Sequence, residues 1–239
     1  MRWLTLDRKP EPEVMADAGE VEAYASAAGQ AFLDAIDNTL VAQVLSFRPL
    51  RGILLDIGTG PGAIPLKIVR RCPDLRVVGV DCSLNMIQTA RKAAAEQGVA
   101  ACASFFLADG NSLCFPDASF DFVLANSVLH HLENPVTVFN EVARVAKPHG
   151  IILVRDLRRP SRLAFPLHVR WYGRYYSGLM YKLYVDSVRA AYTGSELAGL
   201  LRRSALADAQ VFYHERTHLG FLRNGRATDR ATGQETAAA

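Results

Sequence analysis

Hydrophobic residues recur between residues 51 and 156 in short continuous runs, and amphipathic stretches separate these runs. The runs predict five buried strands, at "GILLDIG", "LRVVGVD", "ASFFLAD", "SFDFVLAN" and "IILVRD". The stretches between them predict helices: "GAIPLKIVRRC", "SLNMIQTARKAAAEQG" with Ser83 as N-cap and Gly98 as stop, and "PVTVFNEVARVAKPHG" ending at Pro148. Strand–helix alternation of this kind favours a mostly parallel sheet with helices on both faces.

The chain on either side of this alternation has a different pattern. A polar lead-in is followed by "EVEAYASAAGQAFLDAIDNTLVAQVL", which predicts a helix. Near the other end, "TGSELAGLLRRS" predicts a helix that begins with a Thr193/Glu196 capping box, and "DAQVFYHE" and "THLGFLRN" predict a closing antiparallel pair. We therefore expect a seven-stranded α/β domain over residues 51–222, a helical lead-in or lid over residues 1–50, and a disordered tail over residues 223–239.

Composition is that of an ordinary soluble globular protein, with 50% hydrophobic and 21% charged residues among 239. The first residues carry acids and prolines where a signal peptide needs an apolar run, and no apolar segment approaches the roughly 18 residues of a membrane span. The four cysteines form no CxxC pair and have no metal-ligand spacing. Reduced thiols, a cytoplasmic location and no bound metal are therefore expected.

Charge is divided unevenly along the chain, although the net formal charge is only +3. Residues 151–239 hold 14 Lys and Arg against 7 Asp and Glu, whereas the first 150 residues hold 13 against 17. A net charge of +7 thus follows one of −4. This asymmetry indicates different roles for the two parts of the chain.

Polar residues follow the predicted strands at the point where each strand ends: Asp56, Asp81, Asp109, Asn126 and Asp156. In open parallel sheets, ligands bind in the crevice at the carboxyl ends of the strands. We therefore expect these side chains to face a single cleft.

A glycine-rich loop, "GTGPGA", opens directly after the first strand. It satisfies the GxGxxA pattern of dinucleotide sites, but any nucleotide-like cofactor that lies against bare backbone needs such a loop. Asp56 before the loop would repel a pyrophosphate and attract an ammonium group, Pro61 lies inside the loop, and Asp109 would suit an adenine amino group. These features favour a cofactor other than a nicotinamide dinucleotide, which stays open as an alternative.

Four segments resemble, in order and at the family's spacing, the class I S-adenosylmethionine-dependent methyltransferases. They are "LLDIGTGPG", "VVGVDCSLNMIQTA", "FFLADGNSLCFPDASFDFVLANSVLHHLENP" and "EVARVAKPHGIILVRD". The resemblance is to the branch that contains the ubiquinone/menaquinone C-methyltransferases and many small-molecule enzymes. It implies a Rossmann-like seven-stranded sheet, with a helical cap inserted after strand five over residues 157–192.

The resemblance also implies which residues hold the cofactor, S-adenosyl-L-methionine. The loop glycines would let its amino-acid end lie against backbone, and Asp56 would help to hold the loop and the ammonium group. Asp81 would accept both ribose hydroxyls, and Asp109 the adenine amino hydrogen. The implied cofactor-binding residues are Asp56, Gly58, Thr59, Gly60, Gly62, Asp81, Cys82, Met86, Asp109, Gly110, Asn111, Asn126 and Ser127.

The expected reaction is methyl transfer to a small-molecule acceptor, by in-line attack on the sulfonium methyl group, assisted by proximity and desolvation. A general base is needed only if the acceptor arrives protonated, and His130 and His131 in "SVLHHLENP" are the candidates. Adjacent residues on a helix point about 100° apart, so at most one is expected to face the cleft, and the resemblance favours His131. A packing or capping role for either histidine stays open.

Acceptor choice is expected to depend on two parts of the chain. One is the N-terminal helix with Tyr24, which in the resembled family can fold over the cofactor. The other is residues 155–192, with eight Lys or Arg, two acids and eight aromatic residues. Arg155, Trp171 and Tyr175 are its candidate contacts to an anionic or aromatic acceptor.

Other interpretations of the basic aromatic segment stay open. Its aromatic residues, three or four apart in "WYGRYYSGLMYKLY", would also suit a helical hairpin with a buried stripe, whereas contact with a membrane surface or nucleic acid is less favoured. Asp156 beside it is expected in a salt-bridged surface turn. For the whole chain, an NAD-dependent dehydrogenase and a non-catalytic S-adenosylmethionine-binding module remain alternatives, and the oligomeric state is open.

Overall fold

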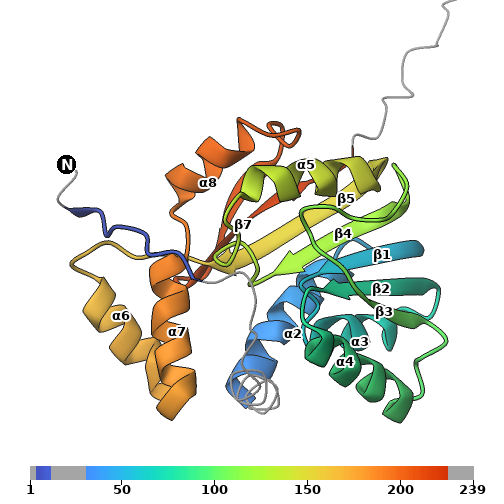
Figure 1. Ribbon diagram of the computed structural model, residues 1–239, viewed down its shortest axis with the longest axis horizontal. Helices are drawn as coiled ribbons and strands as arrows, with labels where there is room; N and C mark the ends of the chain where they lie inside the picture. The colour runs from blue at the N-terminus through green and yellow to red at the C-terminus, as the bar shows by residue number, and fades with distance from the viewer. Residues whose placement is uncertain (1–3, 12–30, 226–239) are drawn as a thin grey trace, which may run out of the picture.

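The computed structural model describes residues 4–11 and 31–225, so Tyr24 and most of the expected tail lie outside the described residues. Its single sheet has the strand order β3-β2-β1-β4-β5-β7-β6 (Figure 1). The strands are β1 Gly52–Ile57, β2 Leu75–Asp81, β3 Ala103–Leu107, β4 Phe120–Asn126, β5 Ala146–Leu157, β6 Gln210–His214 and β7 His218–Arg223. The first five pair in parallel and β7 runs antiparallel to both β5 and β6, which confirms the predicted mostly parallel, seven-stranded α/β fold.

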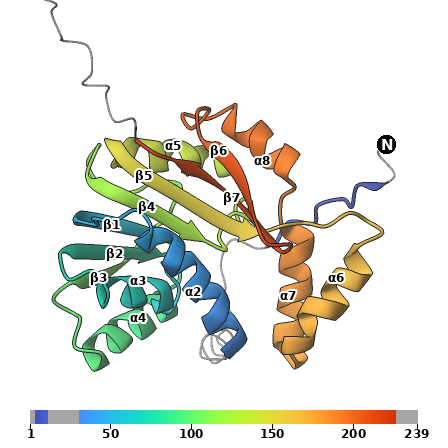
Figure 2. The same ribbon diagram turned by 180° about the vertical axis from the view of Figure 1, so that it is seen from behind.

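Helices cover both faces of the sheet, and each face has its own apolar core. One core packs α2, α3 and α4 against the sheet, and the other packs α5 and α8 against it (Figures 1 and 2). The helices are α2 Ala31–Leu45, α3 Ala63–Val69, α4 Leu84–Glu96, α5 Pro135–Val145, α6 Phe165–Tyr172, the 3-10 turn η2 Gly173–Tyr175, α7 Gly178–Ala190 and α8 Gly194–Leu201.

Local sequence signals account for several helix ends. The Ser83 hydroxyl accepts a hydrogen bond from the Met86 amide at the start of α4, and Gly98 adopts a left-handed φ of 68° just after the helix. Thr193 and Glu196 form the predicted capping box of α8. These three predictions are confirmed.

The end of α5 was predicted three residues too late. The helix ends at Val145, and Ala146 already has the extended ψ of 138° and pairs with Phe120 at the start of β5. Pro148 explains the early end, because a proline disfavours helical backbone at the preceding residue. The strand can then continue through Gly150 after a register shift.

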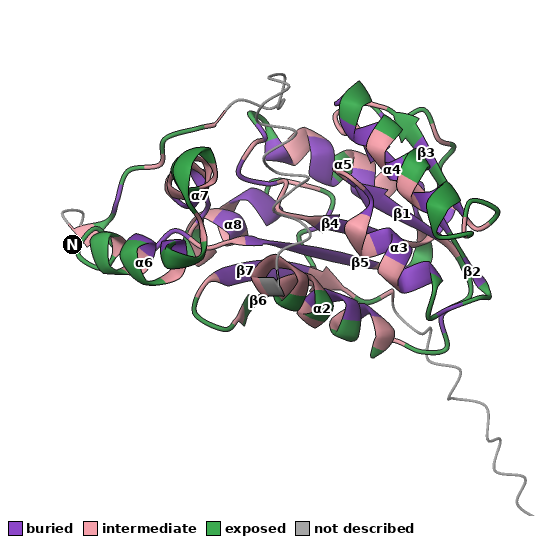
Figure 3. Ribbon diagram, turned by 90° about the horizontal axis from the view of Figure 1, so that it is seen from below, coloured by how far each residue is buried: buried purple, intermediate pink, exposed green. Residues whose placement is uncertain are grey.

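A cap formed by α6, η2 and α7 follows β5 and lies beyond the tips of the parallel strands, apart from α3 and α4 (Figure 1). A bridge between Arg158 and Tyr192 joins the two ends of this segment at its base. Much of the outer surface of α6 and α7 is exposed (Figure 3). No helix in the described parts of the chain has both the length and the apolar character needed to span a bilayer.

Residues 4–11, which we call the strap, run along the base of the cap. The Arg162 amide donates to the Leu4 carbonyl at 2.9 Å, and the Lys9 amide donates to the Arg189 carbonyl at 3.3 Å. The guanidinium of Arg8 donates to the Ala190 carbonyl at 2.6 Å. These contacts bring the start of the chain next to the site described below.

Candidate functional site

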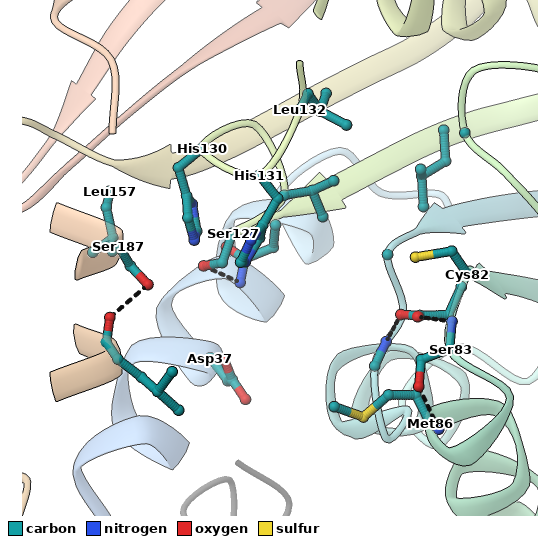
Figure 4. A pocket seen from close by; sticks show the side chains of 18 of the residues that line it. Asp37, Cys82, Ser83, Met86, Ser127, His130, His131, Leu132, Leu157 and Ser187 are labelled. Atoms are coloured by element: carbon teal, nitrogen blue, oxygen red, sulfur yellow. Dashed lines mark hydrogen bonds between the residues drawn. The ribbon is translucent and has the colours of Figure 1, made fainter. Parts of the chain in front are cut away.

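A cavity of about 370 Å³ opens at the carboxyl ends of the parallel strands, where the sequence predicted a cleft. Its walls come from the strand tips on one side and from α2 and the cap on the other, with the turn after β4 between them (Figure 4). Ten of the thirteen predicted cofactor residues line it, and nine of them lie at the strand tips, in the loops after them or in the first turn of α4: Gly58, Gly60, Asp81, Cys82, Met86, Asp109, Gly110, Asn111 and Asn126. Ser127, from the turn after β4, also lines it.

The glycine loop after β1 has a left-handed backbone conformation that is energetically unfavourable for residues other than glycine. Gly58, Gly60 and Gly62 have φ values of 65°, 54° and 82°. A Cβ on Gly58 would lie 2.3 Å from Cγ2 of Val128, so this glycine also permits close packing against the turn after β4. Gly62 precedes α3 and does not line the cavity. The loop thus presents bare backbone to the cavity at its first two glycines.

Asp56 and Thr59 hold this loop from inside the protein. Both are buried, and the Thr59 hydroxyl donates to Asp56 Oδ2 at 2.8 Å. Burial raises the pKa of Asp56 to about 7, an effect that the Thr59 hydrogen bond only partly offsets. Neither residue lines the cavity, so the contact predicted between Asp56 and the cofactor ammonium stays a prediction.

Asp81 at the tip of β2 presents an oriented carboxylate to the cavity. The Gly60 amide donates to its Oδ2 at 2.9 Å, and the Ser83 amide donates to its Oδ1 at 2.8 Å. Burial raises the pKa of Asp81 above its usual value. Each oxygen keeps acceptor capacity, which suits a carboxylate that is to receive two neighbouring hydroxyls.

The loop after β3 places a second carboxylate at the cavity. Asp109 Oδ1 accepts hydrogen bonds from the Asn111 backbone amide at 2.8 Å and from its side-chain amide at 2.9 Å. Asp109, Gly110 and Asn111 all line the cavity, with the apolar side chains of Ala108 and Met86 beside them. The arrangement can receive a flat ring with an amino group at its edge.

The turn after β4 does not form the helix that the sequence suggested. Ser127 has a left-handed φ of 57°, and residues 127–132 form a turn, so the helical 100° offset does not apply. His130 and His131 both line the cavity, with ring centroids 4.1 Å apart (Figure 4). The expectation that at most one histidine faces the cleft is therefore wrong.

His130 is held by Asp156, the residue at the end of β5. The His130 amide donates to Asp156 Oδ2 at 2.9 Å, and its Nδ1 donates to Asp156 Oδ1 at 2.6 Å. Both side chains are buried, so the predicted salt-bridged surface turn at Asp156 is wrong. Burial alone would lower the pKa of His130, but the Asp156 carboxylate raises this pKa above its usual value. Burial alone would raise the pKa of Asp156, but the contacts with His130 lower it below its usual value.

Glu11, at the end of the strap, faces the same two histidines, a contact that no sequence signal predicted. Its Oε2 lies 3.7 Å from His130 Nε2 and 3.8 Å from His131 Nδ1. Burial raises the pKa of this carboxyl. The residues are about 120 positions apart in the chain, so only the fold brings them together.

Arg155 was predicted to contact the acceptor, but the structure places it inside the protein. Its side chain is fully buried and donates to Asn126 Oδ1 at 3.0 Å, to Thr39 Oγ1 at 2.8 Å and to the Ile36 carbonyl at 3.2 Å. Burial lowers its pKa to about 10. Arg155 therefore connects β4 and β5 to α2 and does not line the cavity.

The other predicted acceptor residues of the cap do not line the cavity. Trp171 is 63% exposed, and Tyr175 is 42% exposed and stacks on Phe32 at 4.0 Å. Their neighbours Tyr172 and Tyr176 line the cavity instead. The cap residues that line it share a spacing of three or four, which was the available signal for the inward face: Tyr172, Tyr176, Met180, Leu183 and Tyr184.

The charge of the cavity lining is one-sided. Carboxylates come from Asp37, Asp81 and Asp109, of which the sequence had not singled out Asp37. Of the residues that the structure covers, no Lys or Arg lines the cavity. Burial of His218, another lining residue that the sequence had not indicated, lowers its pKa to about 3. The lining therefore offers no fixed cation to an anionic ligand.

Comparisons with known proteins agree with this geometry. A family model described as "Methyltransferase domain" matches residues 55–154. The ubiquinone/menaquinone biosynthesis C-methyltransferase of Desulfotalea psychrophila is 31% identical over 161 residues, which are 67% of this chain and 64% of that protein. The demethylmenaquinone methyltransferase of Thermus thermophilus is 33% identical over 119 residues, which are 50% of this chain and 53% of that protein.

The chain thus spans between about half and two thirds of the length of these two relatives. The crystal structure of the plantazolicin methyltransferase BpumL matches 89% of this chain and 92% of that chain with a TM-score of 0.66; at 17% identity this likeness supports the fold alone. The family model covers the strands that form the cofactor side of the cavity, and the first relative extends the match beyond them. Residues 55–154 of this chain therefore belong to the methyltransferase family that this model describes, and the chain is similar to class I S-adenosylmethionine-dependent methyltransferases over 161 residues.

Proposed function

We propose that the protein transfers a methyl group from S-adenosyl-L-methionine to a small, uncharged aromatic acceptor. The observation that carries this proposal is the continuity of the cavity, which joins the glycine loop and Asp81 to the aromatic inner face of the cap. A donor at the strand tips and an acceptor under the cap would therefore share one enclosed space. The methyltransferases named above support the reaction, and none of them supports the dehydrogenase alternative.

The residues at the strand tips fit the donor group by group. Gly58 and Gly60 leave room for its amino-acid end, and the Asp81 carboxylate is held by two backbone amides in a position to receive the ribose hydroxyls. Val80 and Met86 supply apolar surface near Asp109 for the adenine. The solved structure of BpumL is described as a complex with S-adenosylhomocysteine, the product of such a donor.

Bound S-adenosylmethionine supplies a methyl group that is already activated on a positively charged sulfur. The protein then has to hold the acceptor in line with this methyl group and to exclude water, and such positioning lowers a barrier by up to ~7–11 kcal/mol. Tyr172, Tyr176 and Tyr184 can hold a flat acceptor by ring contacts, because they line the cap side of the cavity. His130, oriented by Asp156, and His131 lie between the two sides and can take or hold the acceptor's proton.

The character of the acceptor follows from the lining. An anionic acceptor, which the sequence left open, would meet the carboxylates of Asp37, Asp81 and Asp109 without a lysine or arginine from the described lining. Two relatives are named for ubiquinone or menaquinone compounds. We infer an aromatic acceptor of comparable kind, with an oxygen substituent that the histidines can contact.

Calorimetry with S-adenosylmethionine, S-adenosylhomocysteine and NADH tests the cofactor. We expect micromolar or tighter binding of the first two and none of NADH. Asp81→Ala should weaken this binding at least about tenfold, because a charged hydrogen-bond acceptor is lost; Asp117→Ala, at a carboxylate with a 79% exposed side chain, is the matched control. Unchanged affinity in folded Asp81→Ala would contradict the assigned ribose site.

Incubation with S-adenosylmethionine carrying a deuterated methyl group, in a cell extract rich in aromatic metabolites, tests the reaction. We expect S-adenosylhomocysteine to form and a labelled methyl group to appear in an uncharged aromatic compound. Cofactor binding without any S-adenosylhomocysteine would instead support the non-catalytic binding module. A labelled carboxylate or phosphate compound would overturn the acceptor class.

A further inference from the structure

We propose that Glu11, His130 and His131 form a binding site for one divalent transition-metal cation at the acceptor end of the cavity. Their ligand atoms all lie within 4.8 Å of one another. The three side chains come from the strap and from the turn after β4, and both histidines line the cavity. Figure 4 shows the two imidazole rings side by side, facing the space between the strand tips and the cap.

The separations between these atoms point to a shared ion. Glu11 Oε2 lies 3.7 Å from His130 Nε2 and 3.8 Å from His131 Nδ1, which is too far for direct hydrogen bonds. Two ligand atoms bound at ~2.1 Å to one ion in tetrahedral geometry are about 3.4 Å apart. The third separation, between the two histidine nitrogens, is within 4.8 Å, so small side-chain shifts would let all three atoms reach one ion.

The Glu11 carboxylate supplies a second, independent observation. Its Oε2 is buried and has no hydrogen-bond partner among the residues that the structure describes, although Ser187 forms a hydrogen bond with the same carboxyl group. A buried acceptor without a donor is costly, so such atoms are rare unless an ion or water satisfies them. The unpartnered oxygen faces the two imidazoles.

The surroundings hold the histidine in the orientation that a metal ligand needs. His130 Nδ1 donates to Asp156 Oδ1 at 2.6 Å, so in the neutral imidazole, the form that binds a metal ion, Nε2 is the lone-pair nitrogen that faces Glu11. Metal-bound histidines almost always donate their second nitrogen in this way. Arg8 fixes the strap on the same turn, because its guanidinium donates to the His130 carbonyl at 2.9 Å, and this places Glu11.

The donor set selects the class of ion. Two imidazoles and one carboxylate suit Zn²⁺, Fe²⁺, Co²⁺ or Ni²⁺, whereas Mg²⁺ and Ca²⁺ favour all-oxygen sites. Three protein ligands leave coordination positions on the cavity side. If the proposed methyl transfer holds, an acceptor oxygen could occupy such a position and lose its proton there more readily.

Titration of the metal-stripped full chain with Zn²⁺ in a calorimeter tests the site without cofactor or acceptor. We expect one equivalent to bind and to raise the thermal unfolding temperature, and Co²⁺ to give the visible absorption of a four- or five-coordinate site. Glu11→Gln and His131→Ala should each weaken binding at least about tenfold, and Asp156→Asn by a comparable factor through His130. His149→Ala, at an exposed position outside the cavity, is the matched control and should bind as the wild type does.

Absence of stoichiometric binding to the folded wild-type chain would overturn the proposal, and so would equal binding by folded Glu11→Gln. Glu11 lies on the strap and outside the sheet cores, so this variant is expected to fold even where Asp156→Asn does not. If the chain transfers methyl groups but binds no Zn²⁺, the proposed metal site is wrong and the proposed function is not affected. If the chain binds Zn²⁺ but forms no S-adenosylhomocysteine, the proposed function is wrong and the proposed metal site is not affected.

Discussion

Replacement of His218 by leucine should change how the free energy of unfolding depends on pH. His218 is only 5% exposed, and its pKa is lowered to about 3 by burial and by nearby Arg155. The unfolded chain binds a proton at this residue below pH ~6.5, while the folded chain stays neutral there until about pH 3. Acid therefore favours the unfolded state, and the wild type should lose stability as the pH falls through this window.

The magnitude follows from the width of the window. Each pH unit below ~6.5 costs up to about 1.4 kcal/mol, so the wild type should lose about 2 kcal/mol between pH 7.5 and 5 that His218→Leu does not lose. The shared contributions of all other groups cancel in the difference between the two proteins. Loss of the hydrogen bond between His218 Nδ1 and the Thr217 hydroxyl shifts the variant's stability by an amount that does not depend on pH in this range.

Urea unfolding at half-unit steps from pH 5 to 7.5, without cofactor and with a chelator present, measures this difference. His149→Leu, at an exposed position, is the matched control and should follow the wild type. A wild-type minus His218→Leu difference that stays constant over the range would show that His218 is not buried in its neutral form. The assigned packing of β7 at the cavity would then be wrong.

Three further predictions concern the same fold. Asp56→Asn should show the opposite slope: the raised pKa of about 7 makes the wild type lose about 2 kcal/mol relative to the variant as the pH rises from 5 to 7, measured by the same unfolding series. Gly58→Ala should lower the free energy of unfolding by at least about 1 kcal/mol because of its left-handed φ, and by more because the new Cβ meets Val128. The double variant Gly58→Ala/Val128→Ala should remove this clash but not the backbone strain, and thermal unfolding measures both effects. Tyr176→Ala should raise the KM for the acceptor and leave cofactor affinity unchanged, whereas the exposed Trp171→Ala should change neither in steady-state kinetics and calorimetry.

The cofactor side of the cavity could be predicted because its signals are local. A buried strand, a turn that only glycines adopt easily and a helix start follow one another within a dozen residues around Gly58 and Gly60. Asp81 and Asp109 follow the ends of two parallel strands, and the order of those strands decides that their tips meet. Periodicity thus indicates the strands and their ends, and the family resemblance supplies the order that brings them together.

The acceptor side could not be predicted, because long-range contacts decide which way each side chain faces. Asp156 satisfies the backbone and the ring of His130, and this contact across 26 residues fixes a turn where the local sequence suggested a helix. Arg155, its neighbour in the strand, points to the opposite face and meets α2. The basic composition of the segment suggested a site for an anion. The guanidinium of Arg155 lies against α2 instead, because alternate residues of a strand point to opposite faces of the sheet.

Helical phase explains the remaining difference in the cap. The sequence identified the aromatic stripe but not which of two adjacent ridges faces inward, and Trp171 and Tyr175 lie one residue from Tyr172 and Tyr176. On α6, a rotation of about 100° separates the exposed Trp171 ring from the Tyr172 ring in the cavity wall. Tyr175 ends the 3-10 turn η2, and the extended backbone of Tyr176 separates these two rings instead. Only packing against α2, where Tyr175 stacks on Phe32, fixes the phase.

The donor half and the acceptor half of the cavity are held together by different kinds of contact. The donor half is held by contacts within one segment and between two adjacent parallel strands, such as those of Asp81 with Ser83 and with Gly60. The acceptor half is held by contacts among the strap, the turn after β4 and the cap, which lie far apart in the sequence. Donor chemistry can therefore stay constant within such a fold while acceptor choice changes, because the groups that position the acceptor belong to segments joined only by tertiary contacts.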